Sequence, residues 1–384
     1  MQTTLSQAGS PAIASPASSA LGHARWPLTA AILLAVLALA WFVTVRQSVL
    51  FVIGIGMGGL LAGARFGFTT GWRRLIEARD ASGVFAQIAL LAVAAAISIP
   101  LLAKFPGDLA AALGPPSISL LIGAFVFGIT MQIADGCGSG TLYKAGLGIP
   151  LNMGVLPLFA LGSFLGSVHL HGWLSLGAIA PVSLVRDWGA GGALALTFAG
   201  LAVFGLAAWV WSRKGGAAAS SPWNRKLLLA GVGLALLAVA NLVVAGQPWG
   251  VVYGFGLWAA KVATAAGVFD PAANAFWSQA GNLRTLDQSV FLDVTSITNI
   301  GIMAGALWIA ARKPSSGKPL TGRQWAAVLV AGFLLGYSSR LAFGCNVGAM
   351  VSGISTGSLH GWIWVVLAFA GSLIGVRLRR RLGV

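Results

Sequence analysis

The sequence predicts an all-α protein that crosses a membrane many times. Of its 384 residues, 57% are hydrophobic and only 8% are charged, and the mean hydropathy is +0.87. A soluble domain of this length needs far more polar surface, whereas long apolar stretches are typical of membrane helices. The formal charge of +16 does not indicate a nucleic acid partner, because the basic residues lie in short segments between apolar stretches, where they set the topology.

The first segment, residues 1–24, is rich in Ser, Ala, Thr, Gln and Pro, which predicts a disordered tail before a single transmembrane domain at 25–384. A signal peptide would need basic residues before its apolar stretch. The first arginine is Arg25, so residues 27–45 are predicted to form the first membrane helix. Together with this helix, the later stretches predict nine to eleven spanning helices of roughly 20 residues each, with the remainder short or re-entrant. The later stretches lie at 48–65, 84–103, 116–133, 150–168, 191–212, 226–245, 250–267, 296–311, 324–341 and 359–376.

The basic residues predict which loops face the cytoplasm. Clusters lie at 73–79, 213–226, 312–323 and 377–381. Such clusters remain on the cytoplasmic side of the membrane. Three candidate spans separate the second cluster from the third. Only an even number of spans would return the chain to the same side. Either the segment 250–267 dips into the membrane and returns, or part of 270–295 crosses it. The sequence leaves both arrangements open.

One short motif occurs twice and contains the only two cysteines. Gly128 precedes Cys137 by nine positions and Gly336 precedes Cys345 by nine, with glycines at equal offsets around both thiols. Glycine lets the backbone leave helical geometry, so each motif predicts a break between two helices. The candidate N-cap of the second helix is Ser139 or Thr141 in one copy and Asn346 in the other. A helix start presents free N–H groups, which would place each thiol beside an anion site. The candidate path residues here are Gly136, Cys137, Gly138, Ser139, Gly344, Cys345 and Asn346.

A third, degenerate copy of the motif lies upstream. It consists of Gly59, Gly67, Phe68 and Gly71. This spacing puts Phe68 in the place of the cysteine, and a weaker fourth copy lies at 254–267. We therefore predict two pseudo-symmetric repeats in inverted orientation, 48–170 and 250–378, joined by linker helices at 171–246. Broken helices at corresponding places in two repeats indicate a transport site near the membrane midplane.

Ionisable residues within the apolar stretches are further candidates, because charge inside a membrane is costly. Lys144 either contacts the substrate or extends its amine to the membrane surface. Arg340, five residues before Cys345, either attracts an anion or bonds the free carbonyls of the broken helix. Asp135 would repel an anion, so we predict that it pairs with an arginine or a lysine.

At Gly136-Cys137 and Gly344-Cys345, with further matches at 66–68 and 340–346, the chain resembles the YeeE/YedE family of bacterial inner-membrane proteins. The resemblance covers most of 48–378. It implies an hourglass-shaped α-helical transporter with inverted repeats, in which midplane cysteines pass thiosulfate or a related sulfur compound inward. Members of the thiosulfate-transporting type carry another cysteine in the first motif, where this chain has Phe68.

Two classes of function fit these features. The first is a multi-pass transporter of the inner membrane that takes up a small sulfur-containing anion. Phe68 would then form an apolar constriction that excludes sulfate and admits a softer ion, such as thiosulfate or a hydrosulfide-like species. The second is a membrane thiol relay or redox subunit that passes sulfur or selenium to a cytoplasmic sulfur-carrier or sulfurtransferase protein. Transport is favoured, because a relay would need an activated thiolate and an exit to a soluble partner, and the sequence shows no soluble domain and no paired base. We predict no enzymatic activity, cofactor or metal; two cysteines are too few for a Cys-rich metal site, and four histidines do not change that count.

Overall fold

A computed structural model describes residues 25–214, 223–311 and 320–384. The predicted tail at 1–24 lies outside these residues. The described chain is built from helices, with two isolated β-bridges and no named strand among the described residues. The helices are α2 (Arg25–Phe42), α3 (Val45–Ala64), α4 (Phe68–Ala78), α5 (Ser82–Lys104), α6 (Ile118–Ile133), α7 (Gly138–Gly146), α8 (Pro150–Leu174), α9 (Leu184–Arg213), α10 (Arg225–Ala245), α11 (Val252–Ala265), η1 (Pro271–Ala273), α12 (Ala280–Asp287), η2 (Val290–Leu292), α13 (Val294–Ala310), α14 (Gly322–Leu341), η3 (Asn346–Ser352), α15 (Gly353–Ser355) and α16 (Leu359–Leu382).

Eight helical stretches among the described residues are long and apolar enough to cross a membrane, and α2 and α13 contain shorter apolar helices. Their sum agrees with the predicted nine to eleven spans. Three of the long stretches run through a break into a shorter helix, namely Val45–Ala78, Ile118–Gly146 and Gly322–Ser355. The all-α membrane fold and the predicted helix breaks at both cysteines are therefore confirmed.

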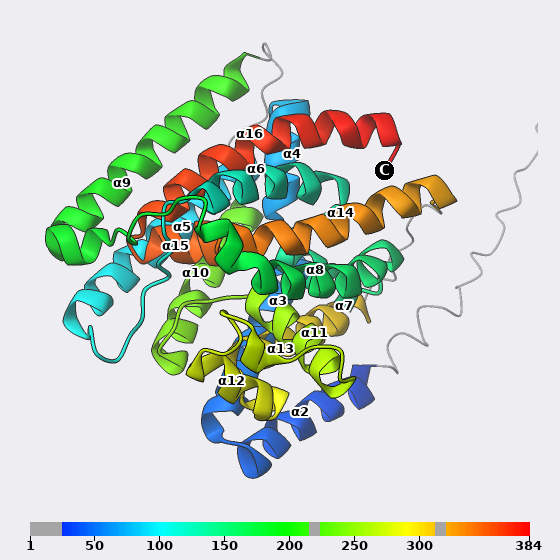
Figure 1. Cartoon of the computed structure of the whole chain (residues 1–384). Helices are drawn as coiled ribbons and strands as arrows, with labels where there is room; N and C mark the ends of the chain where they lie inside the picture. Colours follow the sequence, from blue (N-terminus) through cyan, green and yellow to red (C-terminus); the bar gives the residue numbers. More distant parts are fainter. Residues whose placement is uncertain (1–24, 215–222, 312–319) are drawn as a thin grey trace, which may run out of the picture.

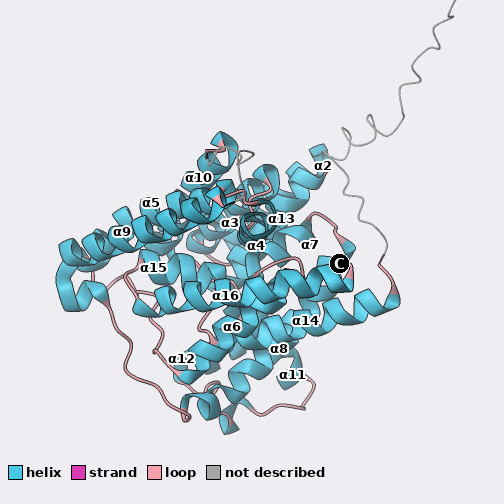
Figure 2. Cartoon of the chain, turned by 90° about the horizontal axis from the view of Figure 1, so that it is seen from above, coloured by secondary structure: helices cyan, strands magenta, loops and turns pink. Residues whose placement is uncertain are grey.

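The helices lie in a bundle whose inner members are long and packed side by side. Figure 1 shows α16, α6, α14 and α8 as neighbours, and α9 along an outer edge. In the view from above, α9 lies beside α5 at the margin of the bundle (Figure 2). Many large side chains of α9, such as Val203 and Leu206, are exposed, as expected for a helix that faces lipid.

Helix ends gather on two faces. On one face the Nε of Arg380, near the end of α16, pairs with Glu77 of α4 at 2.9 Å, and Gln324 of α14 donates to the carbonyl of Gly383. We call this the basic face; it carries Arg73, Arg74, Arg79, Arg323, Arg377, Arg379, Arg380 and Arg381. On the opposite face, Arg46 of α3 donates to the carbonyl of Ala245 at the end of α10. By the positive-inside rule, we still expect the basic face to be the cytoplasmic one.

The segment between α10 and α13 settles the parity question. Gln47, at the start of α3, donates to the carbonyl of Leu292 just before α13, so α10 ends and α13 begins on the opposite face. Helix α11 has 14 residues, and its Lys261 donates to the carbonyls of Leu286 and Gln288 on the returning chain. The segment 250–267 therefore dips in and returns, and only α10 and α13 cross between the two basic loops.

Packing partners support the predicted repeats. Helix α3 packs on α13 while α5 packs on α10, and α8 packs on α14 while α6 packs on α16. Exchanging α3 with α10, α5 with α13, α6 with α14 and α8 with α16 turns each pair into the other. Because α3 runs toward the basic face and α10 runs away from it, the exchange inverts the direction. The repeats remain a prediction, and on this reading the second begins at α10 rather than at residue 250.

Close helix packing depends on glycine at particular positions. A Cβ on Gly128 of α6 would overlap the carbonyl oxygen of Ala368 on α16, whereas a Cβ on Gly59 of α3 would meet nothing within 4 Å. Small residues let membrane helices approach in this way, and their dispersion contacts hold the bundle together.

Gly128→Ala should therefore destabilise the protein by about 2–3 kcal/mol, because α6 and α16 must separate to admit the methyl group. Gly59→Ala is the matched control and should have the same melting temperature as the parent chain. Thermal unfolding of both purified variants in detergent checks the difference. Equal melting temperatures for Gly128→Ala and the parent would show that this contact does not set the helix spacing.

Candidate functional site

Three helix breaks share one backbone conformation. The residue before each second helix is extended, namely Gly67 before α4, Cys137 before α7 and Cys345 before η3. Two positions earlier the backbone is left-handed, at Arg65, Asp135 and Phe343, with φ of 52°, 54° and 56°. Each cysteine itself occupies the N-cap position, so the expectation that Ser139 or Thr141 caps one helix and Asn346 the other is wrong. The chain therefore places both thiols at helix N-termini.

The first break differs from the prediction in its register. The first turn closes by bonds from Gly71 N to Gly67 O, from Thr141 N to Cys137 O, and from Ala349 N to Cys345 O. Gly67 therefore stands in the cysteine place, and Phe68 corresponds to Gly138. The glycine spacing that suggested Phe68 is misleading, because the turn that joins α3 to α4 is one residue shorter than the spacing implies.

The fourth break lies between α10 and α11, upstream of the stretch 254–267 where the sequence suggested it. Helix α10 ends at the left-handed Gly246, and Val251 is the N-cap of α11. The Nδ2 of Asn299, on α13, donates to the carbonyl of Val251 at 2.9 Å. The prediction missed this break because Val251 has no polar or cysteine side chain that would mark it.

The two cysteine breaks meet around Gly138. A Cβ at this position would lie 3.0 Å from the Sγ of Cys345 and 3.3 Å from Cγ1 of Val251. Gly138 follows Cys137 directly and begins α7. The structure thus brings three breaks, from distant parts of the sequence, to one place, and the absent side chain of Gly138 lets Cys345 approach.

A narrow cavity lies between the first break and the Cys137 break. It brings together five of the predicted site residues, Phe68, Gly136, Cys137, Ser139 and Lys144. The remaining lining residues are Phe66, Gly67, Thr69, Thr70, Asp135, Gly140 and Tyr143. The rings of Phe66 and Phe68 stand edge to face at 5.5 Å, so one part of the cavity is aromatic and the other is polar.

Both thiols are buried and have weak polar neighbours. The Sγ of Cys137 lies 3.5 Å from the Oγ of Ser139, and the Sγ of Cys345 accepts from the backbone N–H of Val347 at 3.4 Å. Asn346 is fully buried, and both polar atoms of its amide lack a hydrogen-bond partner among the described residues. Gly344, with φ of 149°, turns the chain into this site. A buried amide without a partner is costly, so Asn346 is available to a ligand.

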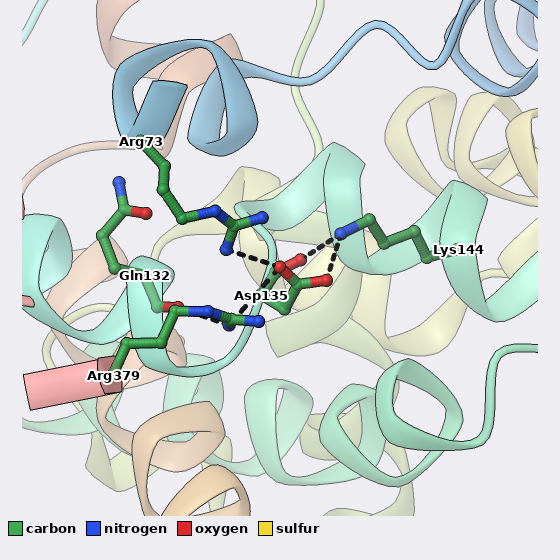
Figure 3. Close-up of polar contacts among 5 residues, drawn as sticks. All are labelled: Arg73, Gln132, Asp135, Lys144 and Arg379. Carbon is green, nitrogen blue, oxygen red and sulfur yellow. Dashed lines mark hydrogen bonds and ion pairs between the residues drawn. The ribbon is translucent and has the colours of Figure 1, made fainter. Parts of the chain in front are cut away.

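Asp135 is paired, as predicted. Its carboxylate lies 2.7 Å from Nη1 of Arg73, 2.6 Å from Nζ of Lys144 and 3.4 Å from Nη1 of Arg379. Figure 3 shows these three cations reaching Asp135 from different sides. The amine of Lys144 therefore bonds to Asp135 at the basic face, and both predictions for Lys144 stay open. Arg73 and Arg379 were assigned only to topology from the sequence, because nothing local marks them as neighbours of Asp135.

Arg340 lies away from this cavity. Its Nε donates to the Oγ of Ser167 on α8 at 2.8 Å, and its guanidinium lies 4.8 Å from the ring centre of Phe276 and 5.9 Å from that of Tyr253. No carboxylate among the described residues pairs with it. These partners belong to α8, α11 and the loop after α11, so Arg340 faces the side opposite to Lys144.

Comparisons with known proteins agree with this architecture. The family described as "Sulphur transport" matches residues 63–374, which include all four breaks. Two relatives, each named "Probable transporter YedE", come from Escherichia coli (strain K12) and Salmonella typhimurium (strain LT2). Each is 34% identical over 77 residues, which is 20% of this chain and only 19% of the relative. Because the family match extends over most of the chain and over both cysteine breaks, the protein belongs to the sulphur transport family.

Proposed function

We propose that the protein is a multi-pass inner-membrane transporter that carries a small sulfur-containing anion into the cytoplasm along a path through Cys137 and Cys345. The observation that carries this proposal is the meeting of the two cysteine breaks around Gly138. Packing alone does not require a cysteine at the same backbone position of two breaks, nor that the two breaks lie close together. Membership of a transporter family also favours transport over catalysis.

The chemistry of the site suits weak, transient contact with a sulfur anion. A thiol is a weak donor and a polarizable acceptor, and weak binding allows an ion to leave as well as enter. Arg340 supports entry from the opposite face, because its guanidinium has aromatic and hydroxyl neighbours and no paired carboxylate among the described residues. Asn346 and the N-termini of α7 and η3 add N–H groups near the thiols.

A thiol relay has less support. A redox or sulfur-carrying cysteine needs an activated thiolate and access to a partner. The polar partners of the thiols are the hydroxyl of Ser139 and the backbone N–H of Val347, and neither is a base or a cation that would activate a thiolate. Both cysteines are buried, and a cytoplasmic sulfur-carrier partner remains a prediction.

The rings of Phe66 and Phe68 give the path its expected selectivity. Although Phe68 is not at the cysteine place, it lines the cavity beside Cys137, and an apolar wall favours ions that shed water readily. Thiosulfate has a soft terminal sulfur, whereas the charge of sulfate is held on compact oxygens. Proteoliposomes with the full chain should therefore take up labelled thiosulfate at least about tenfold faster than sulfate, a difference of about 1.4 kcal/mol.

Uptake of labelled thiosulfate, sulfate and hydrosulfide, measured side by side against empty liposomes, tests both parts of the proposal. Uptake of sulfate as fast as thiosulfate would show that the aromatic wall does not select. If none of the sulfur anions enters, the transport function itself is wrong.

A further inference from the structure

The ion cluster around Asp135 contains more positive than negative charge. Three cations, Arg73 of α4, Lys144 of α7 and Arg379 of α16, lie within 3.4 Å of a single carboxylate. The exposed fractions are 17%, 13% and 19% for the cations and 22% for Asp135. The cluster thus holds two uncompensated positive charges in a largely buried place, an arrangement that costs free energy unless another anion joins it.

The nearest further acid compensates only part of the excess charge. Glu77 of α4 pairs with Arg380 at 2.9 Å, Arg380 is 63% exposed, and Glu77 acts on Arg379 only as a more distant charge. Arg379 and Arg380 are adjacent in sequence but differ in environment: one lies against Asp135, and the other pairs at the protein surface. The Asp135 cluster therefore keeps more positive than negative charge in direct contact.

Unpartnered polar groups lie beside the same cluster. Thr69 lines the cavity together with Asp135 and Lys144; it is 3% exposed, and its hydroxyl has no partner among the described residues. Gln132 is fully buried, its amide is likewise without a partner among these residues, and its backbone carbonyl accepts from Arg379. In Figure 3 the Gln132 side chain points away from Asp135. The free hydroxyl of Thr69 next to surplus cations suits an anion with several acceptor oxygens.

The cluster also adjoins the cysteine path. Asp135 and Lys144 line the cavity that contains Cys137, and they lie on the basic face beside α4 and α16. An anion that leaves Cys137 toward this face meets Lys144 and Arg73 next.

We propose that Arg73, Lys144 and Arg379 form an anion-binding release site on the basic face, where a divalent oxyanion of sulfur takes the place of Asp135 as their counter-ion. This proposal rests on the transport function and adds the last binding step. Asp135 holds the cations when no anion is present. Because the carboxylate competes for the same N–H groups, it keeps anion binding weak and lets the ion leave for the cytoplasm. No bond is made or broken covalently.

Asp135→Asn gives the first test, because it removes the competing carboxylate and leaves three cations. The purified full chain is melted in sodium thiosulfate and in sodium chloride of equal ionic strength. Thiosulfate should raise the melting temperature of Asp135→Asn by several degrees more than that of the parent, and the apparent affinity should increase about tenfold. Glu77→Gln is the matched control, since it removes a carboxylate from the surface pair, and should respond like the parent. An equal response of all three proteins overturns the proposal.

A second test covers the case in which Asp135→Asn does not fold. Arg379→Gln leaves Asp135 with Arg73 and Lys144, and should lower thiosulfate stabilisation and the maximal uptake rate about tenfold. Arg380→Gln on the same helix should keep both values. Unchanged stabilisation and rate in Arg379→Gln overturn the release site. The two proposals can also fail separately. If thiosulfate stabilises the parent chain but not Arg379→Gln, and the parent chain shows no uptake, the transport function is contradicted and the anion site stands.

Discussion

Replacement of Cys137 or Cys345 by alanine should reduce thiosulfate uptake by about five- to tenfold. Each thiol lies at the N-cap of a broken helix, and the two breaks meet at Gly138. Losing one polarizable contact on a narrow path raises the barrier to the passing ion by about the free energy of a weak hydrogen bond, 1–1.5 kcal/mol. Initial uptake rates in proteoliposomes measure the effect.

Folding should change little in these variants. Both cysteines are buried, with exposed fractions of 1% and 0%, and replacement by alanine removes one sulfur atom, at a cost of about 1 kcal/mol. Melting temperatures and reconstitution yields serve as the control. Normal uptake by the double variant Cys137→Ala/Cys345→Ala, with normal yield, would exclude the thiols from the mechanism.

Gly138→Val should close the path almost completely. The added Cβ would lie 3.0 Å from the Sγ of Cys345 and 3.3 Å from Val251, and the two methyl groups of valine extend further into the same space. Because helix α7 is packed against α8 and α13, it has little room to retreat. We expect uptake to fall to the level of empty liposomes.

Gly172→Val, at a position on α8 where a Cβ meets nothing within 4 Å, is the matched control for the effect of valine in a membrane helix. It should insert and transport like the parent chain. Substantial uptake by Gly138→Val, with correct insertion, would mean that the anion passes elsewhere.

Hydropathy and glycine placement in the sequence sufficed for the all-α membrane fold and for helix breaks at both cysteines, because both depend on local properties. A run of apolar residues must be helical in a bilayer to satisfy its backbone, and a glycine pair near Cys137 or Cys345 permits the turn wherever the helices later pack. The family match over residues 63–374 spans both breaks. The pairing of Asp135 could also be foreseen, since an unpaired carboxylate is too costly in a membrane.

Tertiary structure decided which distant residues share the site. Arg379 reaches the backbone of Gln132, 247 positions away in the sequence, and so joins Arg73 at Asp135, although all of these basic residues looked alike as topology signals. The length of one turn, which differs by a single residue, puts Gly67 in the cysteine place. The contact of Lys261 with the carbonyl of Leu286 holds α11 against the returning chain. Hydrophobicity determines which residues of the chain form each helix. Ion pairs and close contacts form between helices that are distant in the sequence, so these contacts are determined only when the bundle packs.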